Sequence, residues 1–342
     1  MPRVPVLVRD ATPADAAAIA RVARASWTDT YRDIFEPAFI DGFLRDHYAP
    51  ELLAAQAAAS AGRTDRHFLV AERGGEVVAY AQYGVGERGP ELHRLYADPA
   101  HYGSGAGSAL LDELHRRLDP EVDAYVLDVH SRNARGRAFY DRKGFVIVGG
   151  GATPDCDLTL QRTLHPRRAT LPILTERLRL RALLDDEREA ARLHAIYGDA
   201  ETMRFIGTSG MPTSDVAATR RILRRLVEHG LLHGFTLWAV DERDGDPLIG
   251  VCGLMWVEGH GPDVEAAYLF RRDRWGRGYA SEALRAVLHV AHGELGLRRV
   301  VALAYPANDA SRRVMEKAGM RRDGKQEAYG RTLTRHASGP MP

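Results

Sequence analysis

The stretch "HYGSGAGSALLDEL" (His101–Leu114) places three glycines within five residues, directly before a segment with helical periodicity. The preceding stretch "ELHRLYADP" (Glu91–Pro99) is typical of a strand that ends at its proline. A strand–glycine–helix turn directs several free backbone N–H groups to one point, and the helix N-terminus adds about half a positive charge. Glycine permits close approach to the backbone, because no Cβ intervenes. The turn therefore predicts a site for an anion such as pyrophosphate, with an ordinary tight turn as the alternative.

The same pattern occurs twice in the chain. "RWGRGYASEALRAV" (Arg274–Val287) repeats the glycine stretch with Gly276 and Gly278 in the places of Gly103 and Gly105. Two further pairs of segments match at similar spacing, and in the later pair an Asn is followed by a Gly 11 residues on, in "NARGRAFYDRKGF" and "NDASRRVMEKAGM". Such self-similarity predicts two tandem copies of one fold. We expect an N-terminal domain over residues 1–164, a linker over 165–173 and a C-terminal domain over 174–342.

Length and composition agree with two ordinary domains. The chain has 342 residues, of which 45% are hydrophobic and 27% are charged. Lys and Arg number 47 and Asp and Glu 46, for a net charge of +1, so the charge balance predicts neither a nucleic-acid nor a membrane partner. Two distant cysteines, Cys156 and Cys252, make no disulfide or metal pattern, which favours the cytoplasm. The N-terminal "MPRVPVLVRD" lacks the apolar run of a signal peptide, and we expect no metal site.

The order of elements predicts the fold class. Each copy has a strand, one or two helices, antiparallel strands, the glycine turn with its helix, an apolar strand, an Asn-led helix and a final strand. We therefore expect an α/β fold of the α+β mixed-sheet kind. Each domain would contain a mostly antiparallel twisted sheet flanked by helices.

Neither copy matches a common nucleotide-binding motif. The Walker A pattern is absent, and the dinucleotide pattern GxGxxG lacks its third glycine in both copies, since Ser108 and Ser281 stand there. Both halves instead resemble the GCN5-related N-acetyltransferase (GNAT) superfamily, whose signature is [RQ]xxGx[GA]. Tyr102 and Trp275 stand where that signature has Arg or Gln. The wording "WGRGYASEAL" of the second half is similar to the ribosomal-protein N-acetyltransferase branch.

The resemblance implies an N-acetyltransferase that moves an acetyl group from acetyl-CoA to a primary amine by direct attack in a ternary complex. Acetyl-CoA would place its pyrophosphate on the glycine turn and its pantetheine arm along the preceding strand. The implied cofactor-binding residues of the first half are Leu95, Tyr96, Ala97, Tyr102, Gly103, Ser104, Gly105, Ala106, Gly107, Ser108, Asn133 and Tyr140. Those of the second half are Leu269, Phe270, Trp275, Gly276, Arg277, Gly278, Tyr279, Ala280, Ser281, Asn308 and Ser311.

The first half contains candidates for both acid and base. Tyr140 lies seven residues after Asn133, and the resemblance implies that it donates a proton to the departing thiolate; the alternative is a core aromatic. Asp128 ends the apolar strand "AYVLDVH", where burial would raise its pKa towards that of a useful base. A strand-end cap or an ion pair with a nearby arginine is the other interpretation. Glu91 is the second candidate base.

The second half departs from this arrangement. Met315 stands where the first half has Tyr140, and it has no proton to donate. Glu265 is the candidate base, and Ser311 is a candidate donor. Asn308, like its counterpart in the first half, also suits a helix N-cap. An alternative is therefore that only one half is catalytic and the other is a cofactor-binding or scaffolding module.

The acceptor is expected to be a small-molecule or peptide amine. Trp27 and Tyr31 lie four residues apart and would share one helical face, either in the acceptor wall or in the core. A homodimer is one option for the assembly, on which the sequence carries no signal. The remaining rival, a nucleotide-binding oxidoreductase, is disfavoured by the incomplete dinucleotide motif.

Overall fold

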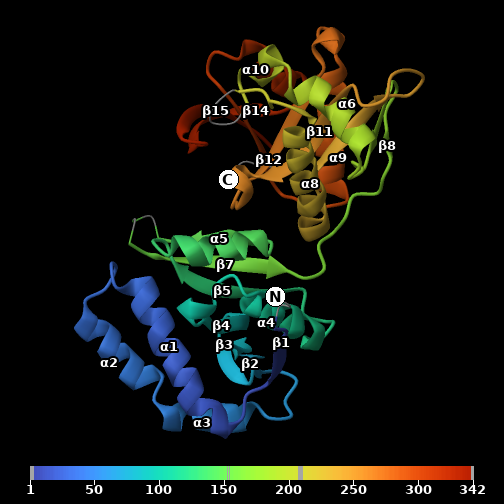
Figure 1. Cartoon of the computed structure of the whole chain (residues 1–342). Coiled ribbons are helices and arrows are strands. Elements are labelled where there is room, and N and C mark those ends of the chain that lie inside the picture. The colour runs from blue at the N-terminus through green and yellow to red at the C-terminus, as the bar shows by residue number, and fades with distance from the viewer. Residues whose placement is uncertain (1–3, 152, 154, 207–210, 340–342) are drawn as a thin grey trace. The chain divides into compact units, whose positions relative to one another are not determined.

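The computed structural model describes residues 4–151, 153, 155–206 and 211–339. The chain divides into two compact units, Met1–His165 and Pro166–Pro342 (Figure 1). The division lies at the first residues of the segment expected as a linker. Each unit contains one mixed sheet with helices, so the expected fold class is confirmed.

The first unit contains a seven-stranded sheet in the order β1-β2-β3-β4-β5-β7-β6. All neighbouring strands are antiparallel except β4 and β5, which are parallel. Its elements are β1 (Val6–Asp10), η1 (Pro13–Asp15), α1 (Ala16–Tyr31), α2 (Pro37–His47), α3 (Pro50–Ser60), β2 (His67–Arg73), β3 (Glu76–Gly86), β4 (Gly89–Ala97), η2 (Pro99–His101), α4 (Ala106–Arg117), β5 (Ala124–His130), α5 (Ala134–Arg142), β6 (Phe145–Gly150) and β7 (Asp157–Thr163).

The second unit contains an eight-stranded sheet in the order β14-β15-β13-β12-β11-β10-β9-β8. Here the parallel neighbours are β12 and β13. Its elements are β8 (Ile173–Leu174), β9 (Leu178–Arg181), α6 (Glu187–Tyr197), α7 (Ala200–Met203), α8 (Val216–His233), β10 (Leu237–Glu242), β11 (Gly250–Trp256), η3 (Val257–Gly259), β12 (Val264–Phe270), η4 (Arg272–Arg274), α9 (Tyr279–Gly293), β13 (Val300–Ala304), α10 (Asp309–Lys317), β14 (Arg321–Ala328) and β15 (Arg331–Ser338).

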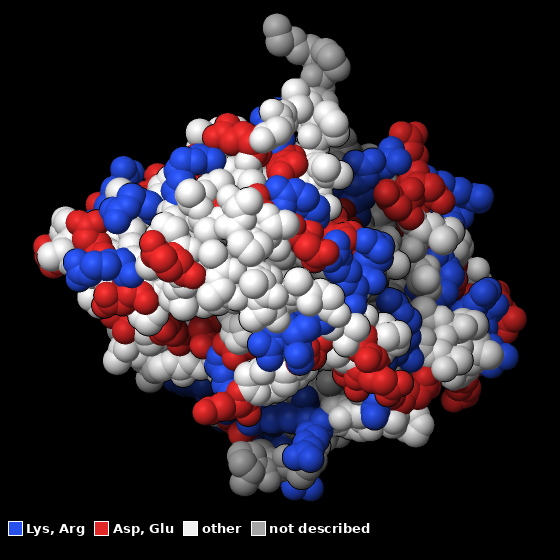
Figure 2. Space-filling view, turned by 90° about the horizontal axis from the view of Figure 1, so that it is seen from below, with Lys and Arg blue, Asp and Glu red and all other residues white. Residues whose placement is uncertain are grey.

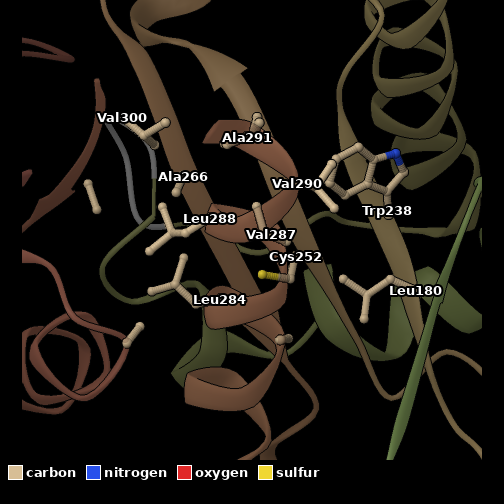
Figure 3. Packing of buried hydrophobic residues seen from close by; sticks show 14 of the residues in the cluster. Leu180, Trp238, Cys252, Ala266, Leu284, Val287, Leu288, Val290, Ala291 and Val300 are labelled. Carbon is tan, nitrogen blue, oxygen red and sulfur yellow. The ribbon is translucent and has the colours of Figure 1, made fainter. Parts of the chain in front are cut away.

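Each sheet is covered by helices on both faces. In β2, alternate residues enter different cores: Leu69 and Ala71 pack in the cluster that includes α4, whereas Phe68 and Val70 pack in the cluster that includes α1 to α3. This alternation is the period of two that a strand buried on both faces requires. In the second unit, α9 packs its apolar side chains over Leu180, Trp238, Cys252, Ala266 and Val300 of five strands (Figure 3).

An irregularity in the pairing of β3 with β4 is absent from the corresponding strands of the second copy. The pairing of β3 with β4 shifts by one residue, since Tyr83 pairs with Leu92 and Gln82 with Arg94, so His93 is the extra residue of a β-bulge. The pairing of β11 with β12 is regular. Because of this extra residue, Glu91 occupies the place of Glu265: each is the residue at which its strand pairs with the parallel neighbour.

Candidate active site

The two glycine turns have the same backbone conformation. Gly103 and Gly105 have φ of +76° and +92°, and α4 begins at the next residue. Gly276 and Gly278 have φ of +75° and +80°, and α9 begins directly after them. These left-handed values favour glycine. A Cβ at Gly103, Gly105 or Gly276 would meet nothing within 4 Å, so the space in front of both turns is open to a ligand.

The parallel strand pairs separate beside these turns. Within the described residues, β4 pairs with β5 only at Glu91 with Val126, and β12 pairs with β13 only at Glu265 with Val301. The parts of β4 and β12 that run on to the glycine turns therefore have no ladder partner on that side. Backbone N–H and C=O groups there are available to an extended ligand.

In the first unit a cavity of about 370 Å³ lies at this separation. Parts of α1, β4, the glycine turn with the start of α4, β5 and α5 line it. Of the predicted site residues of this half, Glu91 alone is absent from its lining. Those that line the cavity are Leu95, Tyr96, Ala97, Tyr102, Gly103, Ser104, Gly105, Ala106, Gly107, Ser108, Asp128, Asn133 and Tyr140.

Tyr140 is buried in the wall of this cavity. Its ring packs against Phe139 and Phe145, with centroids 5.3 and 5.1 Å away. Burial raises the pKa of its hydroxyl. Within the part of the chain that the structure describes, no hydrogen-bond partner of this hydroxyl is recorded. Tyr140 is thus both a packed aromatic, as the alternative expected, and a lining residue of the cavity.

Asp128 forms the ion pair that the alternative interpretation predicted. Arg88 lies in the turn between β3 and β4. Its Nη2 donates hydrogen bonds to Asp128 Oδ2 at 2.9 Å and to Glu91 Oε1 at 2.7 Å. Thr159 Oγ1 donates to Asp128 Oδ1 at 2.8 Å. Burial acts to raise the pKa of Asp128, but the hydrogen bonds from Arg88 and Thr159 outweigh it and hold the pKa below its ordinary value. The expectation of a raised pKa is therefore wrong.

The two asparagines are helix N-caps, as the sequence indicated. Asn133 Oδ1 accepts a hydrogen bond from the Gly136 backbone N–H at 2.8 Å. Asn308 Oδ1 accepts one from the Ser311 N–H at 3.0 Å. Both bonds satisfy backbone donors at a helix start. Asn133 also lines the cavity, so capping and ligand contact are compatible there.

Aromatic residues replace the Arg or Gln of the signature at both turns. The guanidinium of Arg135, from α5, lies 4.3 Å from the centroid of the Tyr102 ring, which returns a cation to the neighbourhood of the turn. Trp275 stabilises the second glycine turn, because its Nε1–H donates a hydrogen bond to the Phe270 carbonyl oxygen at 2.8 Å. Neither arrangement could be found from the motif alone.

The other predicted residues of the second turn are fixed by their own contacts. Arg177 Nη1 donates to the Arg277 carbonyl at 3.0 Å, and its guanidinium lies 4.7 Å from the centroid of the Tyr279 ring. Ala280 is half-buried and Ser281 is buried at the start of α9. Leu269 and Phe270, at the end of β12, place their side chains in the two cores on opposite faces of the sheet.

Glu265 is a buried carboxylate in the second unit. Tyr329 donates its hydroxyl to Glu265 Oε2 at 2.7 Å. Burial raises the pKa of Glu265 to about 7, against the opposing effects of Tyr329 and the Leu303 backbone N–H. A pKa near the working pH is the value that suits a general base. No cation is paired with Glu265 among the ion pairs recorded for the described residues, in contrast to Asp128 and Glu91.

The predicted donor Ser311 lies against a tyrosine that sequence reasoning missed. Tyr268 donates its hydroxyl to the Ser311 carbonyl at 2.9 Å, and the two side-chain oxygens are 2.8 Å apart. A hydroxyl carries one proton, so Ser311 Oγ donates to Tyr268 in this arrangement. Met315 is buried in the core beneath α9 and α10.

Trp27 and Tyr31, the two candidates for the acceptor wall, have different surroundings. Trp27 and Tyr31 share one face of α1, with ring centroids 4.5 Å apart. Trp27 packs in the core against Phe43, at 4.4 Å. Tyr31 is also buried, but it lines the cavity, and burial raises its pKa to about 12.

Charge and metal patterns add no further site. Figure 2 shows basic and acidic side chains interspersed over the face in view. Among the described residues, no cluster of His, Cys, Asp and Glu side chains is suited to a metal ion, and no helix has the length and apolar character to cross a membrane.

Comparison with known proteins covers both units. The family model described as "Acetyltransferase (GNAT) family" matches residues 25–145, and the one described as "Acetyltransferase (GNAT) domain" matches residues 177–321. The uncharacterized N-acetyltransferase YoaA of Bacillus subtilis is 30% identical over 159 residues, which are 46% of this chain and 88% of that protein. The spermidine N(1)-acetyltransferase of Thermoplasma acidophilum is 28% identical, over 39% of this chain and 83% of its own length. A solved structure of the PaiA N-acetyltransferase from Thermoplasma acidophilum, in complex with coenzyme A, is 25% identical with a TM-score of 0.43, over 46% of this chain and 99% of that one.

Proposed function

Because this chain belongs to the GNAT family of acetyltransferases, we propose that it moves an acetyl group from acetyl-CoA to a primary amine by direct attack in a ternary complex. It is an acetyl-CoA-dependent acyltransferase. Acetyl-CoA supplies the acetyl group as an activated thioester. The observation that carries the proposal is the cavity of the first unit, whose lining joins the glycine turn to Tyr140 and Asp128.

Acetyl-CoA fits the residues that surround each glycine turn. The open space before Gly103 and Gly105 is the volume that a Cβ would fill, and the N–H groups of residues 103–108 would hold the pyrophosphate there. Leu95 to Ala97 line the cavity where β4 has left β5, so their backbone would bind the pantetheine amides. In the second unit the corresponding groups are those of residues 269–270 and 275–281, with Asn308 and Ser311 at the start of α10.

In the first unit, Tyr140 would donate its proton to the leaving sulfur. Its hydroxyl is held in the cavity wall and is not committed to a described hydrogen-bond partner. Asp128, whose pKa is held low, would be ionised near neutral pH. It would attract the acceptor's ammonium and accept its proton when Arg88 is displaced. Glu91, held by the same arginine, is the second carboxylate available to the acceptor.

In the second unit, Glu265 would be the base. Glu265 is buried and has a pKa of about 7, which suits a base. The carboxylates of the first unit suit that role less well, because they are paired with an arginine. Ser311 would donate the proton that Met315 cannot supply, after its hydroxyl turns from Tyr268 to the sulfur.

The acceptor would be a small-molecule or peptide amine. One relative is named a spermidine acetyltransferase, so polyamines are the first small molecules to screen, followed by peptide N-termini. We place the reaction in the cytoplasm from the composition and the unpaired cysteines, Cys156 and Cys252, and we keep a homodimer as an open assembly.

The alternative is that one unit alone is catalytic. Calorimetric titration of the full chain with acetyl-CoA tests this without knowledge of the acceptor. A stoichiometry of two supports both sites, and Gly105→Val and Gly278→Val should each reduce it to one. A valine is strained at both of these left-handed positions; it would fill the open space at Gly105 and contact the Arg177 guanidinium at Gly278. Unchanged binding in both variants would refute the assignment of the glycine turns.

Turnover then assigns chemistry to each unit. In the Gly105→Val background, Glu265→Gln should abolish acetyl transfer by the second unit, because glutamine cannot accept the proton. In the Gly278→Val background, Asp128→Asn should reduce transfer by the first unit. Full turnover in either double variant would refute the corresponding base.

A further inference from the structure

The turn between β14 and β15 contains a residue that its geometry disfavours. Ala328 pairs with Arg331, so Tyr329 and Gly330 form a two-residue hairpin turn, with φ of +54° and +68°. Turns with two positive φ values favour Asn-Gly or Asp-Gly. A tyrosine in the first place is strained, and such strain is retained where the surrounding structure holds it.

A second strained residue holds Tyr329 in place. Glu258, in η3, has φ of +55°. The Tyr329 backbone N–H donates to Glu258 Oε1 at 2.7 Å, and the Glu258 backbone N–H donates to the Tyr329 hydroxyl oxygen at 3.2 Å. The two residues therefore fix each other, and the hydroxyl oxygen receives a donor from the backbone.

This arrangement directs the phenolic proton. A hydroxyl has one proton to donate. Because the Tyr329 oxygen accepts a hydrogen bond from the Glu258 N–H, its own proton points away from Glu258. The proton is then donated to Glu265 Oε2, 2.7 Å away. Glu265 receives this hydrogen bond while it is buried within the sheet.

We propose that Tyr329 is a positioning residue, which orients the Glu265 carboxylate and tunes its proton affinity for base catalysis in the second unit. The inference rests on the proposed function of Glu265 as the base. Asp128 and Glu91 of the first unit are held by Arg88, whereas Glu265 is held by a neutral phenol. A neutral donor stabilises the carboxylate less than a guanidinium does, and it leaves the carboxylate able to accept a proton near neutral pH.

The electrostatic surroundings give the sign of the effect. Burial raises the pKa of Glu265, and the hydrogen bond from Tyr329 lowers it. Tyr268 on the same strand and Glu258 on η3 are the other titratable groups coupled to this pair. The neighbouring strands place Met255 and Val301 beside Glu265, and neither titrates. Removal of the Tyr329 hydroxyl should therefore raise the pKa of Glu265 further.

Infrared difference spectroscopy of the full chain tests this without an acceptor. The C=O band of the protonated Glu265 carboxyl is identified by its loss in Glu265→Gln, and its titration midpoint is measured. In Tyr329→Phe the midpoint should rise by about one pH unit, the size expected when one hydrogen bond to a carboxylate is lost. Tyr197→Phe removes another buried hydroxyl in the same unit and should leave the midpoint in place.

A second variant should shift the titration midpoint of Glu265 in the opposite direction. Replacement of Tyr329 by 3-fluorotyrosine keeps the ring and makes the phenol a stronger donor, so the midpoint should fall. A midpoint unmoved by both changes at residue 329 would overturn the proposal. Full turnover of Glu265→Gln in the Gly105→Val background would instead refute the base on which the proposal rests, whatever the midpoint does. The two failures are therefore distinguishable.

Discussion

Replacement of Glu265 by glutamine should make the second unit more stable at alkaline pH relative to the wild type. In the folded chain, burial raises the pKa of Glu265 to about 7, from an ordinary value of 4.5. Below pH 4.5 the carboxyl is protonated in both the folded and the unfolded state. Between pH 4.5 and 7 the unfolded state releases the proton first, so the free energy of unfolding falls as the pH rises. Glutamine does not titrate and lacks this dependence.

The size of the effect follows from the two pKa values. Each pKa unit corresponds to about 1.4 kcal/mol, and integration of the linkage relation from pH 5 to pH 8 gives a loss of about 2.5 kcal/mol from this one group. The quantity to measure is the difference in unfolding free energy between wild type and Glu265→Gln, because the remaining titrating groups are common to both. That difference should shift by about 2.5 kcal/mol in favour of the variant between pH 5 and pH 8.

The assay must report on the second unit alone. Hydrogen exchange followed by mass spectrometry, on peptides that cover β12 and α9, measures opening of that core at each pH. Glu228→Gln removes a carboxylate that is exposed on α8 and controls for the loss of one negative charge. A wild-type–variant difference that is constant from pH 5 to pH 8 would refute the raised pKa, and with it the argument that Glu265 is adapted to act as a base.

Three further predictions concern other residues. If the Tyr140 hydroxyl is the general acid, Tyr140→Phe should lower turnover by the first unit by about 10²-fold, with little change in acetyl-CoA affinity. Steady-state kinetics in the Gly278→Val background measure this turnover. An unchanged turnover would mean that Tyr140 serves only in packing. Arg88→Ala should move the acidic limb of the first unit's pH–rate profile to higher pH, because the arginine holds the pKa of Asp128 down; an unmoved limb would exclude Asp128 as the titrating base. Arg181→Ala should destabilise the second unit by about 3 kcal/mol, since it leaves the buried Glu189 without its cation; urea denaturation that detects a loss below 1 kcal/mol would contradict this.

Features encoded within short stretches of chain were predictable. The glycine turns, the asparagine caps and the tandem repeat depend on residues within about one helical turn of each other, or on the same pattern written twice. The separation of β4 from β5 was not predicted, because strand pairing depends on segments that lie far apart in the chain. The cavity is lined by the cofactor-binding residues that the resemblance to the GNAT superfamily implied for the first half.

Sequence alone thus determined the fold class, the duplication and the position of the two glycine turns, since backbone conformation and hydrophobic periodicity are local. Only the tertiary structure decided the protonation chemistry. Asp128 has a lowered pKa because Arg88, 40 residues away in the chain, reaches it from the turn between β3 and β4. Glu265 has a raised pKa because it is buried, and its hydrogen bond comes from Tyr329, 64 residues further on. A pKa depends on burial and on the distance to other charged and hydrogen-bonding groups, and the fold sets both.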